Sequence, residues 1–284
     1  WGWIMVAPTI LGLVILNVWP FIQTLYASFC EHLGFGHYKF IGIDNYVTMF
    51  QNTDFWKATW NTVYFCILTV PVGIFLALLV AILLNAKIKG KSIFRSIFFL
   101  PMICAPAAVT LVWRWIFNSE YGILNQILGT NINWITDSKV VMITCAVVAV
   151  WSSIGYDAVL LLSGLQNISK SYYEAASVDG ANVWAQIRHI TIPALRPTII
   201  TLVLLAVGRI CYSDFGLFYQ IPMDSGLLYS TTQTIDTYVY RSLINLNDIG
   251  RSTASGFLQS ILGFICVFIA NTVVAKIDRE SSLF

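Results

Sequence analysis

Long apolar runs without charge dominate the pattern of this chain. No charged residue occurs in 1–29, 58–86 or 252–275. Each run is long enough for a helix, rising about 1.5 Å per residue, to cross about 30 Å of hydrocarbon. A membrane β-barrel would instead alternate apolar and polar positions in segments of about ten residues. The pattern therefore predicts membrane-spanning α-helices, whose backbone groups hydrogen-bond within each segment.

Three further apolar runs contain isolated charges, and we interpret them as spans as well. They are 96–117 with Arg114, 140–164 with Asp157, and 198–219 with Arg209 and Asp214. The predicted fold class is all-α: a polytopic membrane protein with about six transmembrane helices in one domain over residues 1–284.

Composition agrees with a membrane protein, because 57% of the residues are hydrophobic and 11% are charged, against about 25% charged in soluble domains. The net charge of +2 gives no reason to expect nucleic acid as a partner. A native chain starts with Met, so the first residue, Trp1, leads us to expect that some N-terminal sequence precedes it. The first run is also too long for the core of a signal peptide.

Basic residues predict the orientation. The loops after the second and fourth spans and the tail after the sixth hold nine Lys and Arg residues, against five in the alternate loops. Because the richer side normally faces the cytoplasm, we expect a multi-pass membrane protein with both termini in the cytoplasm.

No enzyme site is evident in the sequence. The six cysteines form no C-x-x-C pair and the three histidines have no metal-ligand spacing, so we expect no metal site or other cofactor. A phosphate-binding loop at Gly90-Lys91-Ser92 would need a glycine five positions before Gly90, and that position is Asn85. If the protein uses ATP and magnesium, partner subunits must bind them.

The segment 165–197, between the fourth and fifth spans, is polar and longer than a simple helix connection. Ser171 and Glu174 have capping-box spacing, which predicts the start of a short helix. Gly180 interrupts that helix after two turns. Apolar residues at helical spacing predict a second helix, and Pro193 is expected to end it. The prediction is a helix–glycine–helix elbow with an apolar stripe at the cytoplasmic face.

Two interpretations of this elbow remain open from the residues alone: an amphipathic segment resting on lipid headgroups, or a docking element for a cytoplasmic partner. The residues Glu174-Ala175-Ala176, Gly180 and Ile190 to Pro193 resemble the "EAA" loop of permease subunits of bacterial ATP-binding-cassette (ABC) importers. The resemblance implies that the elbow is the coupling helix that contacts the ATPase subunit. The coupling residues it implies are Glu174, Ala175, Ala176, Gly180, Ile190 and Pro193.

Other motifs resemble the carbohydrate-uptake branch of this family, in particular the type of the maltose transporter's larger permease. They are 40–46, 55–56, 61–62, 99–101, 113–117, 120–125, 217–222, 234–240 and 276–280. The last three resemble most a subgroup that imports oligosaccharides from complex polysaccharides. The resemblance implies the type I ABC importer permease fold, a second homologous permease, two ATP-binding subunits, an extracytoplasmic sugar-binding protein and an oligosaccharide substrate.

Charged and aromatic residues inside the spans are the candidate sugar contacts, since pyranose rings bind aromatic platforms together with polar groups. We hypothesise that Arg209 helps to bind an acidic sugar, because guanidinium pairs bidentately with carboxylate. An Asp157–Arg209 ion pair that only holds two helices together is the alternative. For Arg114 we expect a snorkelling cation in an aromatic belt, with a path residue as the alternative. The candidate substrate-binding residues are Trp151, Tyr156, Asp157, Arg209, Tyr212, Asp214 and Phe215.

Two other protein classes remain as rivals. An ion-gradient-driven secondary sugar transporter would also contain buried charges and broken helices, such as the region of Pro101 and Pro106, but it gives no reason for the elbow. A membrane-embedded enzyme would present Asp, Glu or His clustered at one membrane surface, and the sequence offers none. We therefore expect the permease subunit, which has no ATPase site of its own.

Overall fold

The computed structural model describes residues 1–33, 36–86 and 89–279. Lys87 and Glu280, which contribute to the predicted orientation and to a motif, lie outside the described residues. Within them, the helices that are long and apolar enough to cross a membrane are Met5–Ser28, Thr53–Asn85, Val141–Gln166, Val183–Gly208 and Ile249–Lys276. A bent helix pair, Lys91–Ile103 with Pro106–Ile116, makes a sixth if it counts as one span. The fold is mostly helical, in agreement with the predicted class.

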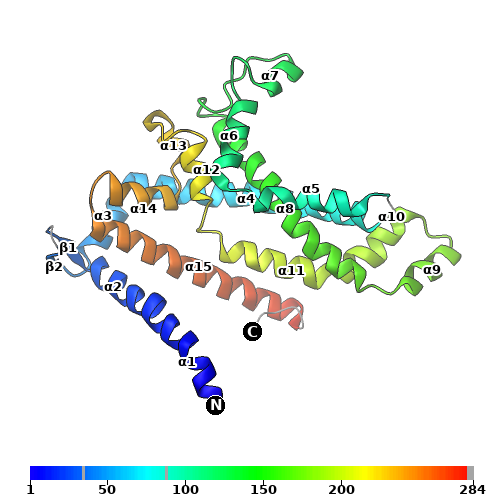
Figure 1. Cartoon of the computed structure of the whole chain (residues 1–284), viewed down its shortest axis with the longest axis horizontal. Helices are drawn as coiled ribbons and strands as arrows, with labels where there is room; N and C mark the ends of the chain where they lie inside the picture. The colour runs from blue at the N-terminus through cyan, green and yellow to red at the C-terminus, as the bar shows by residue number, and fades with distance from the viewer. Residues whose placement is uncertain (34–35, 87–88, 280–284) are drawn as a thin grey trace.

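The N-terminal region leads away from the other helices (Figure 1). It comprises α1 (Gly2–Leu13), a π-helical turn (Val14–Val18) and α2 (Trp19–Ser28). Only α2 packs extensively on another span, α15 (Ile249–Ile277). The hairpin of β1 (Cys30–His32) and β2 (Tyr38–Phe40) follows, with Cys30 opposite Phe40, and then α3 (Asp44–Gln51).

Two long helices, α4 (Thr53–Asn85) and α8 (Val141–Gln166), pack along each other and form the centre of the molecule. Small residues such as Ala77, Ala81 and Ala158 are buried where the helices meet. At Gly155 the backbone of a third helix, α5 (Lys91–Ile103), lies so close that an added Cβ would be 2.0 Å from the carbonyl oxygen of Phe98. Glycine permits this crossing because it has no side chain.

The predicted span 96–117 is wrong as a single straight helix. The helix α5 ends at Ile103, and α6 (Pro106–Ile116) leaves it at an angle of 103°. Cys104 and Ala105 have extended backbones, as expected next to a proline, which disfavours helical geometry in the residue before it. Proline then starts α6, where its missing N–H costs nothing. A loop with the short helix α7 (Ile123–Leu128) connects α6 to α8.

The predicted span 198–219 is displaced. A continuous helical path runs from α10 (Val183–Gln186) through a π-helical turn (Ile187–Thr191) into α11 (Ile192–Gly208). The helix ends at Gly208, and the backbone of Arg209 has already left helical geometry. The predicted boundary of the coupling loop at 197 is therefore also wrong, because the second half of the loop is the first part of the span.

Short helices occupy the region between α11 and α15: α12 (Phe215–Gln220), a 3₁₀ turn (Gly226–Leu228), α13 (Tyr229–Thr232) and α14 (Ile235–Ile244). Buried polar side chains on α4 hold them. The amide of Asn61 donates to the carbonyls of Ser230 and Gln233, and the hydroxyl of Thr62 accepts from the backbone N–H of Ile235. The motif at 61–62 thus has a structural role.

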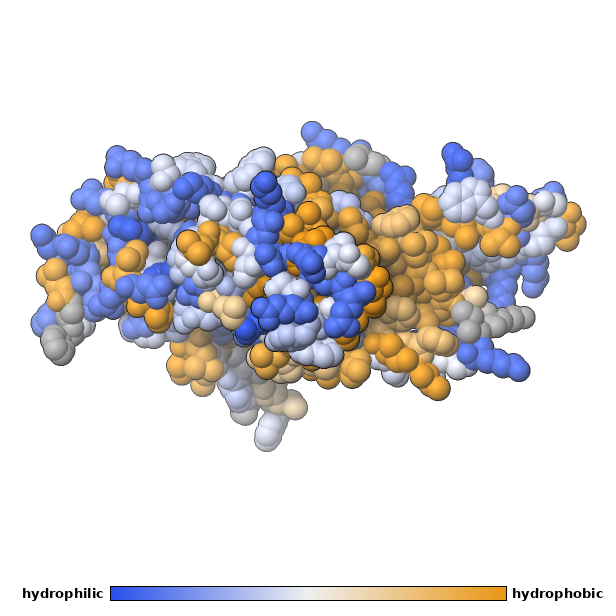
Figure 2. All heavy atoms as spheres, turned by 90° about the horizontal axis from the view of Figure 1, so that it is seen from above, coloured by the Kyte–Doolittle hydropathy of each residue, from blue (hydrophilic) through white to orange (hydrophobic). Residues whose placement is uncertain are grey.

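The surface reflects a membrane environment. Figure 2 shows a broad hydrophobic surface between the polar loop region around α7 and the more hydrophilic end formed by α9 (Lys170–Val178) and α10. Apolar side chains also fill the interior, in one cluster between α4, α8 and α12 and in another between α4, α8 and α11. The elbow lies beyond the second cluster, at one end of the molecule.

Candidate functional site

The helix–glycine–helix elbow lies at the end of the molecule, beyond the other helices (Figure 1). Its first helix, α9, is capped by Ser169, whose hydroxyl accepts the backbone N–H of Ser171. The predicted capping box at Ser171 and Glu174 is therefore wrong by two residues. The extended backbone of Ser169 lets its hydroxyl reach the first turn.

Gly180 forms the turn of the elbow. Its φ of +81° lies in the left-handed region, and the predicted interruption of the helix at this glycine is confirmed. The N–H of Ala181 donates to the carbonyl of Ala176 at 2.8 Å, which closes the end of α9. Asn182 then caps α10 by accepting the N–H of Ala185. Local signals alone thus account for both helices and for the turn between them.

Side-chain hydrogen bonds brace the two arms of the elbow. The amide of Gln186 donates to the hydroxyl of Ser177 at 3.0 Å and to the carbonyl of Ala181 at 3.2 Å. The hydroxyls of Tyr173 and Thr191 lie 3.0 Å apart. These contacts join α9 to α10 and to the π-helical turn before α11.

The tip of the elbow exposes apolar side chains. Val178 is 89% exposed, and Val183 and Trp184 are about 70% exposed. Glu174 and Ala175 are also exposed, whereas Ala176 is half-buried. Isolated apolar residues on a surface are ordinary, whereas several exposed apolar side chains together are typical of surfaces that contact another protein or a membrane.

Pro193 does not end the second helix, contrary to the prediction. It lies in the first turn of α11, immediately after the π-helical turn. There the N–H of Ile192 donates to the carbonyl of Ile187, and such a wide turn adapts the hydrogen-bond pattern to a residue that has no N–H. Ile190 is half-buried in the same turn. The second arm of the elbow and α11 therefore form one continuous helical path.

The base of the elbow is fixed to the span before it. A Cβ on Gly164, near the end of α8, would lie 2.8 Å from both the Cδ2 of Leu195 and the Oγ1 of Thr198 on α11. The two helices that enter and leave the elbow are thus in direct contact, and Leu195 is fully buried between them.

The candidate substrate residues on α8 have different surroundings. Trp151 packs edge-on against Trp113, with ring centroids 5.3 Å apart, and lines an apolar cavity of about 580 Å³ between α4, α5 and α8. Tyr156 is 40% exposed. Asp157 is half-buried and within electrostatic reach of Arg209. The ion pairs of the described residues do not include these two, so the structure shows no direct Asp157–Arg209 ion pair.

The remaining candidates lie after α11 rather than inside a span. Arg209 and Tyr212 are exposed in the non-helical segment 209–214. Asp214 accepts the N–H of Leu217 and caps α12. Phe215 begins that helix and packs on Tyr219 and Tyr240, with centroid distances of 5.3 and 4.8 Å.

Two residues that we did not predict as candidates, the half-buried Asp236 and the buried Gln259, hold this segment. The carboxylate of Asp236, on α14, accepts the backbone N–H and the hydroxyl of Ser213 at 2.6 and 2.7 Å. The amide of Gln259, on α15, donates to Asp236 and to the carbonyl of Cys211, both at 2.7 Å. The motif at 234–240 contained Asp236, but no spacing in the sequence connects it to Ser213.

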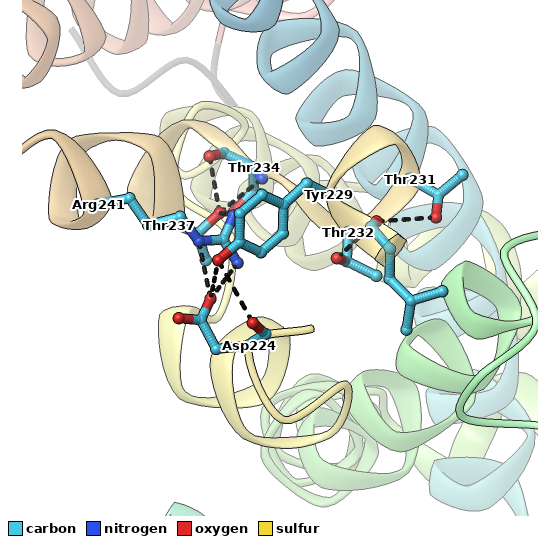
Figure 3. A network of polar contacts seen from close by, with 8 residues as sticks. Asp224, Tyr229, Thr231, Thr232, Thr234, Thr237 and Arg241 are labelled. Carbon is cyan, nitrogen blue, oxygen red and sulfur yellow. Dashed lines mark hydrogen bonds and ion pairs between the residues drawn. The ribbon is translucent and has the colours of Figure 1, made fainter. Parts of the chain in front are cut away.

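A second polar network fixes the loop after α12 (Figure 3). Asp224 pairs with Arg241 at 2.7 Å and accepts the hydroxyl of Tyr229 at 3.1 Å, while the guanidinium of Arg241 lies over the ring of Tyr229. Burial raises the pKa of Tyr229, and the charge of Arg241 opposes that shift. Met223 and Asp224 both adopt positive φ, a strained geometry that the network stabilises.

Metal chemistry has no evident place in the described part of the chain. No group of three or more His, Cys, Asp and Glu residues there is arranged to hold a metal ion. All six cysteines are free. Fold and geometry thus define a polytopic membrane protein with a hydrogen-bonded, exposed elbow connected to two spans.

Comparison with known proteins identifies the class. The family model of the binding-protein-dependent transport system inner membrane component matches residues 52–280. The chain is 31% identical, over 247 residues, to the lactose transport system permease protein LacF of Rhizobium radiobacter, covering 84% of this chain and 82% of LacF.

Two solved structures share the fold at a TM-score of 0.86 and cover 97% of this chain. One is a bacterial alginate ABC transporter in complex with an alginate pentasaccharide-bound periplasmic protein. Its matched chain is 25% identical in sequence to this chain and is covered to 94% of its length. The other is a bacterial ABC transporter involved in the import of the acidic polysaccharide alginate. Its matched chain is 26% identical in sequence to this chain and is covered to 95% of its length. The chain belongs to the inner membrane components of binding-protein-dependent transport systems, and is an ABC transporter permease.

Proposed function

We propose that this protein is the permease subunit of an ATP-driven importer that takes up oligosaccharides delivered by a binding protein. The braced elbow carries this proposal. Its exposed tip suits contact with a partner, and its arms continue into α8 and α11, so a push on the elbow moves two spans together. ATP binding closes the ATPase pair, and the elbow converts that closure into alternation between outward- and inward-open arrangements.

The exposed surfaces of the fold support the partners that we propose. In this proposal two ATPase subunits bind ATP and magnesium and receive the elbow, and this end of the molecule lies in the cytoplasm together with both termini. None of the residues in the most apolar 18-residue stretch of the first span is buried. Trp1, Trp3 and Met5 are at least 80% exposed. A second, homologous permease and membrane lipid cover this helix, because apolar surface of this size is unstable in water.

The translocation path contains the candidate residues of α8 and of the segment after α11. Arg209 and Asp157 attract each other without pairing, so the guanidinium keeps donors for a substrate carboxylate. The structural likeness to importers of the acidic polysaccharide alginate supports an acidic oligosaccharide. In a transport assay, Arg209→Gln should reduce uptake of uronic-acid oligosaccharides more than that of neutral ones. An equal loss on both would contradict this role.

Replacement of Gly180 tests the coupling role. At its φ of +81° any other residue is strained, so Gly180→Val should distort the turn and separate ATP hydrolysis from transport while the complex still assembles. The matched control is Gly129→Val, since Gly129 has a φ of +63° and equally open surroundings but follows α7, away from the elbow. Normal transport by Gly180→Val would contradict the proposal.

An ion-gradient-driven transporter would give a different result in a transport assay with membrane vesicles that contain the protein. Its uptake would persist without ATP and stop when the ion gradient is collapsed. Uptake that requires ATP and the binding protein, and that tolerates loss of the gradient, supports the importer.

A further inference from the structure

A polar cavity of about 290 Å³ lies where α6 ends, away from the elbow and from the apolar cavity beside α8. Three segments distant from one another in the sequence form its walls. They are the last turn of α6 with the residues after it, the residues before α8, and the strained loop after α12. The residues that carry the argument are Arg114, Trp115, Tyr121, Asn133, Trp134 and Met223.

Hydrogen bonds fix the frame of this cavity before any ligand is bound. The side-chain oxygen of Asn118 accepts the N–H groups of Glu120 and Tyr121. A Cβ on Gly122 would lie 2.2 Å from the carbonyl oxygen of Asn118, so the turn needs glycine. Asn125, 6% exposed, donates to two backbone carbonyls and accepts from Thr130. A preorganised frame of this kind lowers the cost of binding.

The aromatic side chains offer ring faces to a ligand. The indole N–H of Trp134 donates to the side-chain oxygen of Asn125 at 2.8 Å. The ring packs against Phe117, with centroids 6.1 Å apart, and also lines the cavity. Trp115 and Tyr121 are 52% and 54% exposed at its rim. Such rings pack against the apolar C–H faces of pyranoses, while hydroxyl edges need polar partners. Within the described residues, the side-chain amide of Asn133 makes no hydrogen bond. It can therefore serve as a polar partner for a sugar hydroxyl.

The guanidinium groups of Arg114 and Arg241, the two arginines of this region, differ in whether they pair with a carboxylate. Arg241 is 5% exposed and pairs with the carboxylate of Asp224. Arg114 is half-buried and contacts the thioether of Met223, and it takes part in no ion pair of the described residues. A thioether is a weak acceptor without charge. Arg114 therefore keeps donors for an anionic ligand, and a carboxylate matches its planar fork.

We propose that this cavity binds one uronic-acid unit of an oligosaccharide, with the carboxylate on Arg114 and the pyranose ring against Trp134 and Trp115. The volume of about 290 Å³ lies just below the range of about 300–1,000 Å³ typical of ligand sites, which suits a single ring rather than a whole oligosaccharide. The proposal rests on the proposed function and adds a receiving site, separate from the candidate path residues, for the same substrate class.

Binding to the purified ABC complex in lipid nanodiscs, measured by calorimetry without binding protein, tests this site. The probes are trigalacturonate and trimannuronate, with maltotriose as the neutral reference. Arg114→Gln should weaken binding of the two uronate probes about tenfold, the loss of one good charge-assisted contact, and change that of maltotriose less than twofold. Trp115→Leu, at the exposed rim, should weaken all three.

Lys139→Gln is the matched control, because it removes one exposed positive charge from the segment before α8, which also contributes Asn133 and Trp134 to the cavity, and Lys139 itself does not line the cavity. It should leave all affinities within twofold. Equal effects of Arg114→Gln on acidic and neutral probes, or no uronate binding by the wild type, would overturn the proposal. The proposal would also be overturned if Arg114→Gln changed the thermal stability of the complex without changing uronate binding, because that result indicates a cation held by lipid headgroups.

Failure of this site is distinguishable from failure of the proposed function. The same preparations are assayed for ATP hydrolysis with binding protein and sugar. Stimulated hydrolysis in the wild type together with unchanged uronate binding in Arg114→Gln rejects the site and keeps the importer. Absence of any stimulation rejects the importer itself.

Discussion

The elbow and the segment 209–214 both connect helices, but they are held in different ways. In the elbow, every bracing contact joins residues within Ser169–Thr191, and the turn itself needs only Gly180. In the segment 209–214, the backbone is held by Asp236 and Gln259, which belong to two other helices. The first region is built locally and the second by the packing of the whole molecule.

This difference suits the two proposed tasks. A coupling element has to transmit movement without deforming, and local bracing gives it a shape that does not depend on the state of the other helices. A segment that contacts substrate has to change when the spans rearrange. Because the carboxylate of Asp236 ties that segment to α14 and, through Gln259, to α15, a shift of either helix alters it.

The strongest test of long-range packing is Gly155→Ala, with the largest expected effect. The new Cβ would lie 2.0 Å from the carbonyl oxygen of Phe98, so α5 and α8 must separate, at a cost of about 3 kcal/mol. The thermal unfolding midpoint of the purified complex should fall clearly. Gly73→Ala is the matched control on α4, since its nearest neighbouring atom is 4.0 Å away. Equal midpoints for the two variants would contradict the close crossing.

Asp236→Ala tests the long-range hold on the segment after α11. It removes the acceptor for Ser213 and Gln259, and hydrogen bonds to a charged group contribute about 1.5–3 kcal/mol. We expect a destabilisation of about 2 kcal/mol together with a loss of transport. Asp54→Ala serves as reference, because its ion pair with Lys57 is exposed and contributes at most about 1 kcal/mol. Full transport by Asp236→Ala would show that the network is dispensable.

Gln186→Ala tests the brace of the elbow. Two hydrogen bonds are lost on the surface, so we expect about 1 kcal/mol of destabilisation. The ratio of sugar transported to ATP hydrolysed should fall by more than this small loss of stability explains, since the two arms no longer move together. Asn182→Ala, which removes only the cap of α10, is the control. An unchanged ratio in Gln186→Ala would indicate that the Tyr173–Thr191 contact alone is sufficient.

Tyr173→Phe is expected to have the smallest effect. It removes one hydroxyl contact, 3.0 Å from Thr191, and keeps the ring, so the cost is about 0.5–1 kcal/mol. Combined with Gln186→Ala, it should lower the coupling ratio by more than the sum of the single effects, because the two contacts brace the same pair of arms. Strict additivity would argue against a shared brace.

Features with a contiguous signal follow from the sequence. The interruption at Gly180 and the two short helices on either side of it follow from nearest-neighbour rules, and the apolar runs identify the membrane class. The effect of proline does not follow in this way, because proline has more than one outcome. Pro106 starts a helix after a bend of 103° and Pro193 is accommodated inside a helical path, and neighbouring residues alone do not decide between a bend, a stop and a wide turn.

The candidate site shows the same division. Arg209, Tyr212 and Asp214 were selected for their chemistry as residues of a span, but the helix ends at Gly208, and Asp214 serves as a helix cap. Asp236 was visible in the sequence only as part of a motif. Its importance arises from Ser213, 23 residues away along the chain, and no periodicity connects the two.

By itself, the sequence determined the membrane environment, the helical class and the elbow, since these depend on hydrophobicity, length and local backbone preferences. The tertiary structure alone decided where the third span bends, where the fifth ends, and which polar groups hold the segment after it. The physical reason is that a buried hydrogen bond forms wherever packing brings donor and acceptor together. Packing of this kind assembled the cavity around Arg114 and Met223 from three separate parts of the chain.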